Sequence, residues 1–86
     1  MPTISKFYGI VIRMYWMDHA RPHIHAFYSG YEAVFGVSPA ARIEGRFPKN
    51  ATRLVLEWIR LYREDLLQDW ELAEAGESLE KIPGLE

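Results

Sequence analysis

The strongest constraint on the fold is a hairpin signal centred on Ser29-Gly30. In segments 23–28 and 31–37, apolar residues alternate with other residues, which is typical of strands that bury one face. Gly30 can adopt the positive φ that a two-residue hairpin turn requires. This turn places Tyr28 opposite Tyr31, and the register then sorts the side chains onto two faces. One face is apolar, with Ile24, Ala26, Tyr28, Tyr31, Ala33 and Phe35, and the other carries His23, His25, Phe27 and Glu32.

Residues 6–16 are rich in β-branched and aromatic side chains and contain no proline, so we expect another strand there. Arg13 and Tyr15 would project from the same face as the histidines. The opposite, core-facing side would carry Tyr8, Ile10, Ile12, Met14 and Trp16. Ser38-Pro39 ends the strand over 31–37, and we expect a short fourth strand over 41–47.

The hydrophobic period changes at Pro48. From there to residue 75, apolar residues recur every three or four positions, which predicts one amphipathic helix over 48–75 with Gly76 as its stop. A bend near 63–65 is compatible with this pattern. We expect residues 76–86 to form a loosely held acidic tail, with anchoring side chains at Leu79, Ile82 and Leu85.

These elements predict an α+β fold in which a small antiparallel sheet of three to four strands packs on one long C-terminal α-helix. The 86 residues suffice for a single domain. We expect the sheet at about 6–47, the helix at about 48–75 and the tail at about 76–86. Since one helix covers only one face of a sheet, the other face stays open unless a partner covers it.

Composition narrows the functional classes. The chain has no cysteine and no apolar run long enough to cross a membrane, so we expect a cytoplasmic protein without disulfides or thiolate metal sites. Residues 1–50 carry six Lys/Arg against three Asp/Glu, and residues 51–86 carry four against nine. This asymmetry can orient a partner, but it is too small to indicate nucleic-acid binding by itself. Phosphate loops, nucleotide-binding glycine fingerprints, nucleophile elbows and helical His-Glu-x-x-His motifs are absent, which excludes the enzyme classes that depend on them.

All three histidines lie within residues 19–25, so this segment is the best candidate for a functional site. The candidate binding surface around it comprises Arg13, Tyr15, His19, Arg21, His23, His25, Phe27 and Glu32. Three interpretations of the segment stay open. In the first, the histidines form hydrogen bonds that shape the loop and have no further role.

The second interpretation is a divalent metal site. His23 and His25 are two residues apart on a predicted strand, so both imidazoles can point to the same side. Glu32 would be a third ligand, and Asp18 or His19 a fourth.

The third interpretation is a site that acts on RNA without a cofactor. His23 or His25 would serve as general acid or base near neutral pH. Arg13 or Arg21 would stabilise a phosphate. The catalytic candidates are therefore His23, His25 and Arg13.

Several segments together carry a family resemblance that runs from residue 2 to about 75. They are Pro2-Thr3-Ile4, Phe7-Tyr8-Gly9-Ile10 and Pro22-His23-Ile24-His25-Ala26, with Trp58 and Trp70-Glu71 further on. With these motifs the chain resembles the short bacterial proteins called domain of unknown function 4160. The resemblance marks His19, His23 and His25 as motif residues without assigning their roles. Where the family usually has a second proline before Pro22, this chain has Arg21, and Ser38-Pro39 replaces a turn that is more often Asp/Asn-Gly.

Family members are often encoded beside another small protein, so the resemblance implies a toxin–antitoxin-like cassette. We therefore expect an interaction module without enzymatic activity that pairs with itself or with a small neighbouring protein. One alternative is an RNA-acting toxin-like enzyme that uses the histidine segment. The other is divalent metal binding through His-x-His, and without it we expect no cofactor. The expected partners are a second copy or a small protein, or RNA for the enzyme, and no membrane.

Overall fold

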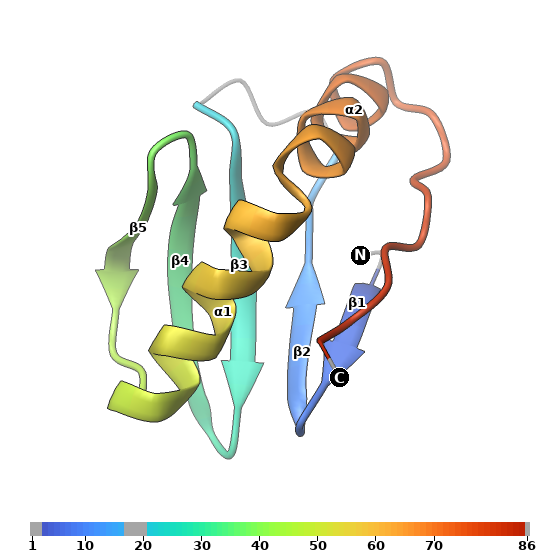
Figure 1. Ribbon diagram of the computed structural model, residues 1–86. Helices are drawn as coiled ribbons and strands as arrows, with labels where there is room; N and C mark the ends of the chain where they lie inside the picture. The colour runs from blue at the N-terminus through green and yellow to red at the C-terminus, as the bar shows by residue number, and fades with distance from the viewer. Residues whose placement is uncertain (1–2, 17–20, 86) are drawn as a thin grey trace.

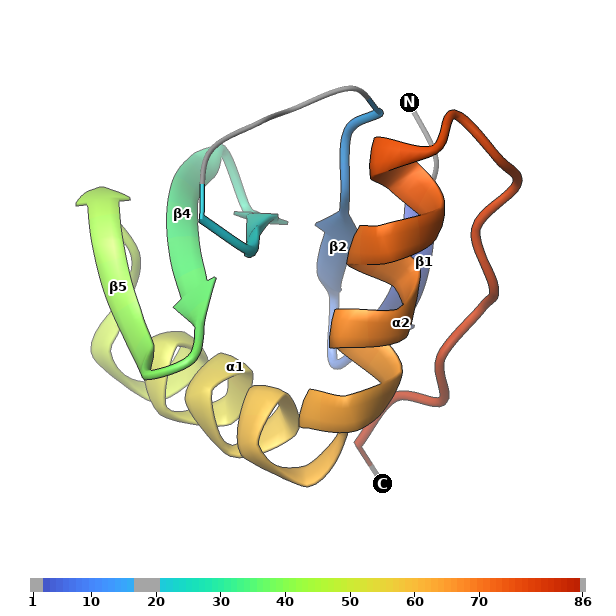
Figure 2. The ribbon, with the colours of Figure 1, turned by 90° about the horizontal axis from the view of Figure 1, so that it is seen from above.

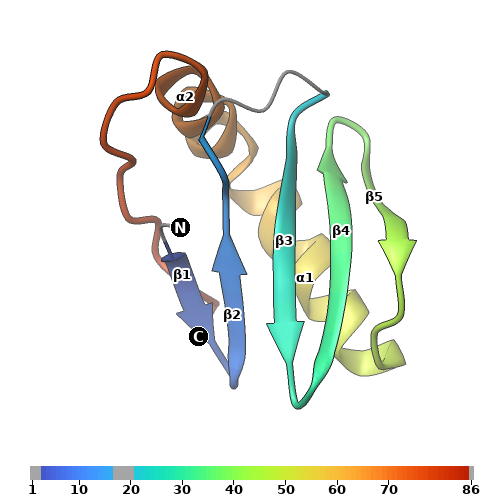
Figure 3. The same ribbon diagram turned by 180° about the vertical axis from the view of Figure 1, so that it is seen from behind.

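The fold is a five-stranded antiparallel sheet followed by two helices, as the computed structural model shows for residues 3–16 and 21–85 (Figure 1). The strands are β1 (Thr3–Phe7), β2 (Ile10–Arg13), β3 (His23–Tyr28), β4 (Tyr31–Val37) and β5 (Ala40–Gly45). They neighbour one another in sequence order, and every adjacent pair is antiparallel. The helices α1 (Lys49–Leu61) and α2 (Arg63–Glu74) lie on the same face of this sheet (Figures 1 and 3). The predicted α+β class is confirmed.

The prediction of a single strand over 6–16 is wrong, because a turn at Tyr8-Gly9 divides it into the hairpin β1–β2. Tyr8 has a φ of 51° and Gly9 a φ of 81°. Bulky residues seldom adopt such a conformation, so the sequence carries no ordinary turn signal at this position. The sheet consequently has five strands instead of three to four. On the predicted core face, Ile10, Ile12 and Met14 are buried, whereas Tyr8 and Trp16 are 56% and 46% exposed.

The predicted hairpin around Ser29-Gly30 is confirmed in every pair, from Tyr28 opposite Tyr31 to Ile24 opposite Phe35. Ser29 and Gly30 have φ values of 47° and 86°, so both turn residues are left-handed. Ile24, Ala26, Ala33 and Phe35 are buried as expected, but Tyr31 at the turn is 46% exposed. The strand that we expected over 41–47 is β5, which begins and ends earlier.

The long helix predicted over 48–75 is divided into α1 and α2, because the helix breaks at Tyr62 (φ −112°, ψ 28°). The break is next to the bend that we considered at 63–65. A straight helix over 48–75 would be roughly 40 Å long, but the longest extent of the molecule is 33 Å. The break lets the second half change direction and stay on the sheet, and Figure 2 shows α1 and α2 running in clearly different directions.

One hydrophobic core lies between the helices and the facing side of the sheet. Trp58, in the last turn of α1, is fully buried, and its ring centroid lies 5.4 Å from that of Phe7. Leu66 and Trp70 on α2 complete this layer. The remaining buried apolar residues are Ile4, Ile10, Ile12, Met14, Ile24, Ala26, Ala33, Phe35, Val37, Phe47, Ala51, Val55, Ile59, Ala73 and Ile82. Within the described part of the chain, no helix has the length and apolarity needed to cross a membrane.

The expectation of a loosely held tail is wrong, because residues 77–85 run back beside α2 and reach the outer edge of β1 (Figure 1). The backbone N–H of Ile82 donates a 2.8 Å hydrogen bond to the carbonyl of Ile4. Two carbonyls of this C-terminal segment accept indole N–H groups, at Glu77 from Trp16 and at Pro83 from Trp58. Ile82 is buried, so its predicted anchoring role is confirmed, and Leu79 and Leu85 pack against the core as well.

Candidate binding face and histidine cluster

The face of the sheet opposite the helices, called here the open face, is turned towards the viewer in Figure 3. The register places two rows of side chains on it that cross neighbouring strands. In the first row, Cα pairing joins Lys6, Val11, Phe27 and Glu32. In the second row, it joins Arg13, His25, Val34 and Glu44. The rows share one face because they use every second residue of each strand. Val11, Phe27 and Val34 are only half-buried, since neither α1 nor α2 covers them.

Arg13 joins the two rows. It pairs with His25 across β2 and β3, and its guanidinium carbon lies 5.0 Å from the ring centroid of Phe27. This cation–π contact places the guanidinium over the aromatic ring. The Nε atom of Arg13 is buried and has no hydrogen-bond partner among the described residues. The predicted sharing of a face by Arg13, His25 and Phe27 is thus found in the fold.

His25 lies at the centre of the predicted cluster. The edge of its ring meets Tyr15 in a T-shaped contact, with 4.5 Å between ring centroids. Its Nδ1 lies 3.9 Å from Oε2 of Glu32, an ion pair when the histidine is protonated. Glu32 reaches it diagonally across the hairpin, as the register predicts. The side chain of Glu32 is 60% exposed, so this pair is accessible to water.

His23 lies at the start of β3, with its ring 5.3 Å from that of His25. Its Nδ1 is 2.7 Å from the carbonyl oxygen of Arg21. A carbonyl only accepts, so Nδ1 carries the proton in this hydrogen bond. The ring centroid of Trp70 lies 5.0 Å from that of His23. The sequence pattern does not predict this contact. Strands β2 and β3 pair only over 11–13 and 25–27 and separate beyond them, which lets α2 approach the histidine (Figures 1 and 3).

The described residues contain no set of ligands that supports the metal interpretation. No three His, Asp or Glu side chains among residues 3–16 and 21–85 are placed to hold a metal ion. The further ligands considered, Asp18 and His19, lie outside the described residues, as does the predicted role of His19 in the binding surface. Arg21 is described and exposed, and its backbone carbonyl contacts His23.

Four residues of the two rows are missing from the predicted binding surface: Lys6, Val11, Val34 and Glu44. Lys6 lies on β1, and the unrecognised turn at Tyr8-Gly9 reverses the chain between it and Arg13. Glu44 faces Val34 only because a bulge interrupts the β4–β5 register between Val34 and Phe35. Position in the sequence alone could not reveal either relationship.

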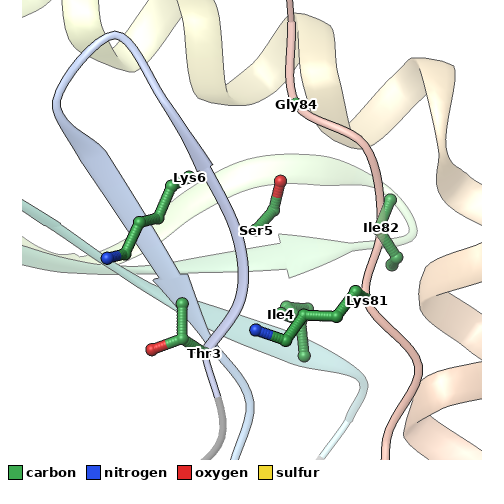
Figure 4. Close-up of a pocket in the computed structure, with 7 residues that line it drawn as sticks. All are labelled: Thr3, Ile4, Ser5, Lys6, Lys81, Ile82 and Gly84. Atoms are coloured by element: carbon green, nitrogen blue, oxygen red, sulfur yellow. The ribbon is translucent and has the colours of Figure 1, made fainter.

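A cavity of about 380 Å³ lies away from the histidine cluster, between β1 and the C-terminal segment (Figure 4). None of the predicted site residues lines it. Its lining includes the exposed Lys6 and Lys81 and the buried Ser5, whose Oγ has no hydrogen-bond partner among the described residues. Thr3, Ile4, Ile82 and Gly84 complete it. Sequence reasoning could not find this cavity because it exists only where the C-terminal segment returns to β1.

Taken together, the topology and the exposed row side chains define a small α+β domain, with a helix-covered core on one side of the sheet and an open face on the other. Residues 9–71 match the family model of the domain of unknown function DUF4160, and the chain belongs to this family. The resemblance seen in the sequence motifs is thereby confirmed. The chain matches no curated protein and no solved structure.

Proposed function

We propose that the protein is an interaction module that binds a protein partner through its open face. The observation that carries the proposal is that both helices lie on the other side of the sheet (Figures 1 and 3). Open faces of antiparallel sheets are usually polar. Here the middle of the face holds Val11, Phe27 and Val34, and a patch of apolar and aromatic side chains framed by charges is typical of protein interfaces.

The experiment is a mass measurement in solution by light scattering. It uses the purified chain alone and the chain mixed with the small protein encoded beside its gene, since the family resemblance implies such a neighbour. We expect a mass above that of the monomer in at least one of the two samples. Phe27→Asp should abolish the association, because it places a charge at the centre of the interface.

Leu61→Asp is the matched control. Leu61 is 64% exposed at the end of α1, so the same apolar-to-acidic change is made away from the open face. This variant should associate like the wild type. A monomer in both samples, or equal loss of association in the two variants, would show that the open face is not the interface.

A second candidate function, RNA cleavage, is favoured by the grouping of His23, His25, Arg13 and Tyr15. Two imidazoles beside a guanidinium supply proton transfer and phosphate stabilisation without a metal. His25→Ala separates the two functions. The enzyme requires this variant to lose RNA cleavage and toxicity, whereas the interaction module has no RNA cleavage for the variant to lose. Cleavage or toxicity that is unaffected by His25→Ala would exclude the enzyme.

A further inference from the structure

The two rows of the open face have the same charge order. The charged ends of the first row are Lys6 on β1 and Glu32 on β4. In the second row, which Thr3 extends to β1, the charged ends are Arg13 on β2 and Glu44 on β5. Along the two rows the charge therefore changes from cationic towards β1 to anionic towards β5. Arg42 on β5 does not belong to these rows, because it pairs with the core-facing Phe35. Between these ends lie apolar or aromatic residues and His25.

From this order we infer that the open face binds a second copy of the chain in a symmetric, face-to-face dimer. A two-fold axis that lies between the two faces, parallel to the strands, reverses the strand order of one copy over the other. The cationic side of each copy then lies over the anionic side of its partner. A closed dimer of this kind uses the same patch on both copies, so each favourable pairing occurs twice.

The charges also select this axis over the alternative. A two-fold axis perpendicular to the strands would stack the β1 side of one copy on the β1 side of the other. Lys6 and Arg13 would then face like charges, as would Glu32 and Glu44, which disfavours the arrangement. Only the axis along the strands matches opposite charges in both rows.

The centre of the face suits the same geometry. The charged residues of the first row are centred between Val11 and Phe27, and those of the second row, Arg13 and Glu44, between His25 and Val34. These centres lie on either side of β3, so an axis that follows β3 is within about 2.5 Å of both, half the spacing of neighbouring strands. Phe27 then meets the central strand of the partner, where a half-buried aromatic side chain contributes most to binding.

The area of the open face sets the expected affinity of the dimer. Five strands of about six residues form a face of roughly 20 by 20 Å. Two copies together would bury an area near the lower limit of stable interfaces, about 1,200 Å². We therefore expect a dimer that dissociates in the micromolar range. Exposed charges are screened by salt, so it should weaken as the salt concentration rises.

The test is a pair of charge reversals, followed by sedimentation analysis. The cationic variant carries Glu32→Lys and Glu44→Lys, and the anionic variant carries Lys6→Glu and Arg13→Glu. Each variant places like charges against like charges in its own dimer, so self-association should weaken at least about 100-fold. Mixing the two variants matches opposite charges again, so the mixture should recover a one-to-one dimer. Because Arg13 is half-buried, Lys6→Glu mixed with Glu32→Lys repeats the test with exposed residues alone.

Matched controls carry the same exchanges on the helices. Glu57→Lys with Glu74→Lys, and Arg53→Glu with Arg60→Glu, change exposed residues on the other side of the sheet. These variants should dimerise like the wild type, and circular dichroism should show that all variants fold. A monomeric wild type at low salt, dimers that survive the reversals, or a mixture that does not recover would each overturn the inference.

The inference rests on the proposed function and can fail separately from it. A wild type that is monomeric alone but binds the neighbouring small protein, with loss in Phe27→Asp, overturns the homodimer and keeps the interaction module. A wild type that associates neither with itself nor with that protein overturns both. Recovery of the dimer only in the mixture of reversed variants supports both.

Discussion

The indole N–H of the buried Trp58 donates a 2.8 Å hydrogen bond to the carbonyl oxygen of Pro83. The two residues are 25 positions apart, and their contact ties the centre of the core to the C-terminal segment. Trp16 makes an equivalent bond to the carbonyl of Glu77, but its ring is 46% exposed. The segment is therefore held at both ends by tryptophans in different surroundings.

Trp58→Phe should lower the free energy of unfolding by about 2–3 kcal/mol, because it removes a buried hydrogen bond and leaves a cavity in the core. Trp16→Phe removes the same kind of bond at the surface, where water can replace it, and should cost less than about 1 kcal/mol. Urea denaturation of both variants measures the difference. Equal losses would contradict the conclusion that the buried Trp58 contributes more to stability than the exposed Trp16.

Asp69 on α2 is 1% exposed, and its Oδ1 accepts a 2.9 Å hydrogen bond from the backbone N–H of Glu80. Burial raises the pKa of the Asp69 carboxyl, the bond to Glu80 opposes this, and the charges of Glu80 and Asp65 raise the pKa further. The folded state then binds this proton more tightly than the unfolded state does. Asp69 consequently makes the domain less stable as pH rises from the unfolded pKa through the raised folded pKa, and more stable as pH falls.

Asp69→Asn checks this pH dependence, because the amide keeps an acceptor for Glu80 and removes the charge. We expect its stability relative to the wild type to increase as pH rises through that window, as measured by urea denaturation. Glu74→Gln is the control, since Glu74 is exposed on the same helix and does not contribute to the raised pKa of Asp69. A stability difference between Asp69→Asn and wild type that does not change with pH would refute the assignment.

Tyr8→Asn should stabilise the protein by about 0.5–1 kcal/mol, because asparagine tolerates the left-handed backbone (φ 51°) better than tyrosine does. Tyr8 is 56% exposed, so little packing is lost. Thermal unfolding measures the change. Tyr31→Asn is the matched control on β4, where asparagine is disfavoured, and it should lower the midpoint. A lower midpoint for Tyr8→Asn as well would show that its ring contributes more than the backbone strain costs.

Gly45→Ala should destabilise the domain by at least about 2 kcal/mol, and Gly30→Ala by only about 1 kcal/mol. Both glycines have nearly the same φ, at 87° and 86°. A Cβ at Gly45 would lie 2.5 Å from the carbonyl oxygen of Glu32, whereas a Cβ at Gly30 meets nothing within 4 Å. Denaturant unfolding of the two variants isolates the steric part of the loss. Similar losses would mean that β5 can move away from β4 at little cost.

The sequence predicted the parts of the fold that depend on local pattern. Alternation on both sides of Ser29-Gly30 was enough for the complete β3–β4 register, because a two-residue turn leaves only one pairing and a slip would expose Ile24 and Phe35. The same reasoning placed His25, Phe27 and Glu32 together on the open face. The change of hydrophobic period at Pro48 indicated that the second half of the chain is helical, because this period is also a local pattern of the sequence.

The parts that the sequence could not predict depend on contacts between distant residues. Tyrosine disfavours the left-handed backbone that Tyr8 adopts, and the pairing of β1 with β2, which begins at Phe7 and Ile10, holds the turn there. The break at Tyr62 follows from the size of the sheet that the helices must cover, and the C-terminal segment is held by Trp58 and Asp69.

The candidate site divides in the same way. Sequence alone determined which residues of the β3–β4 hairpin share a face, because that is a property of strand period. The approach of Trp70 to His23 and the order of charges from Lys6 to Glu44 were decided only by the tertiary structure. They arise from strands and a helix that meet across the fold, and no local pattern encodes such a meeting.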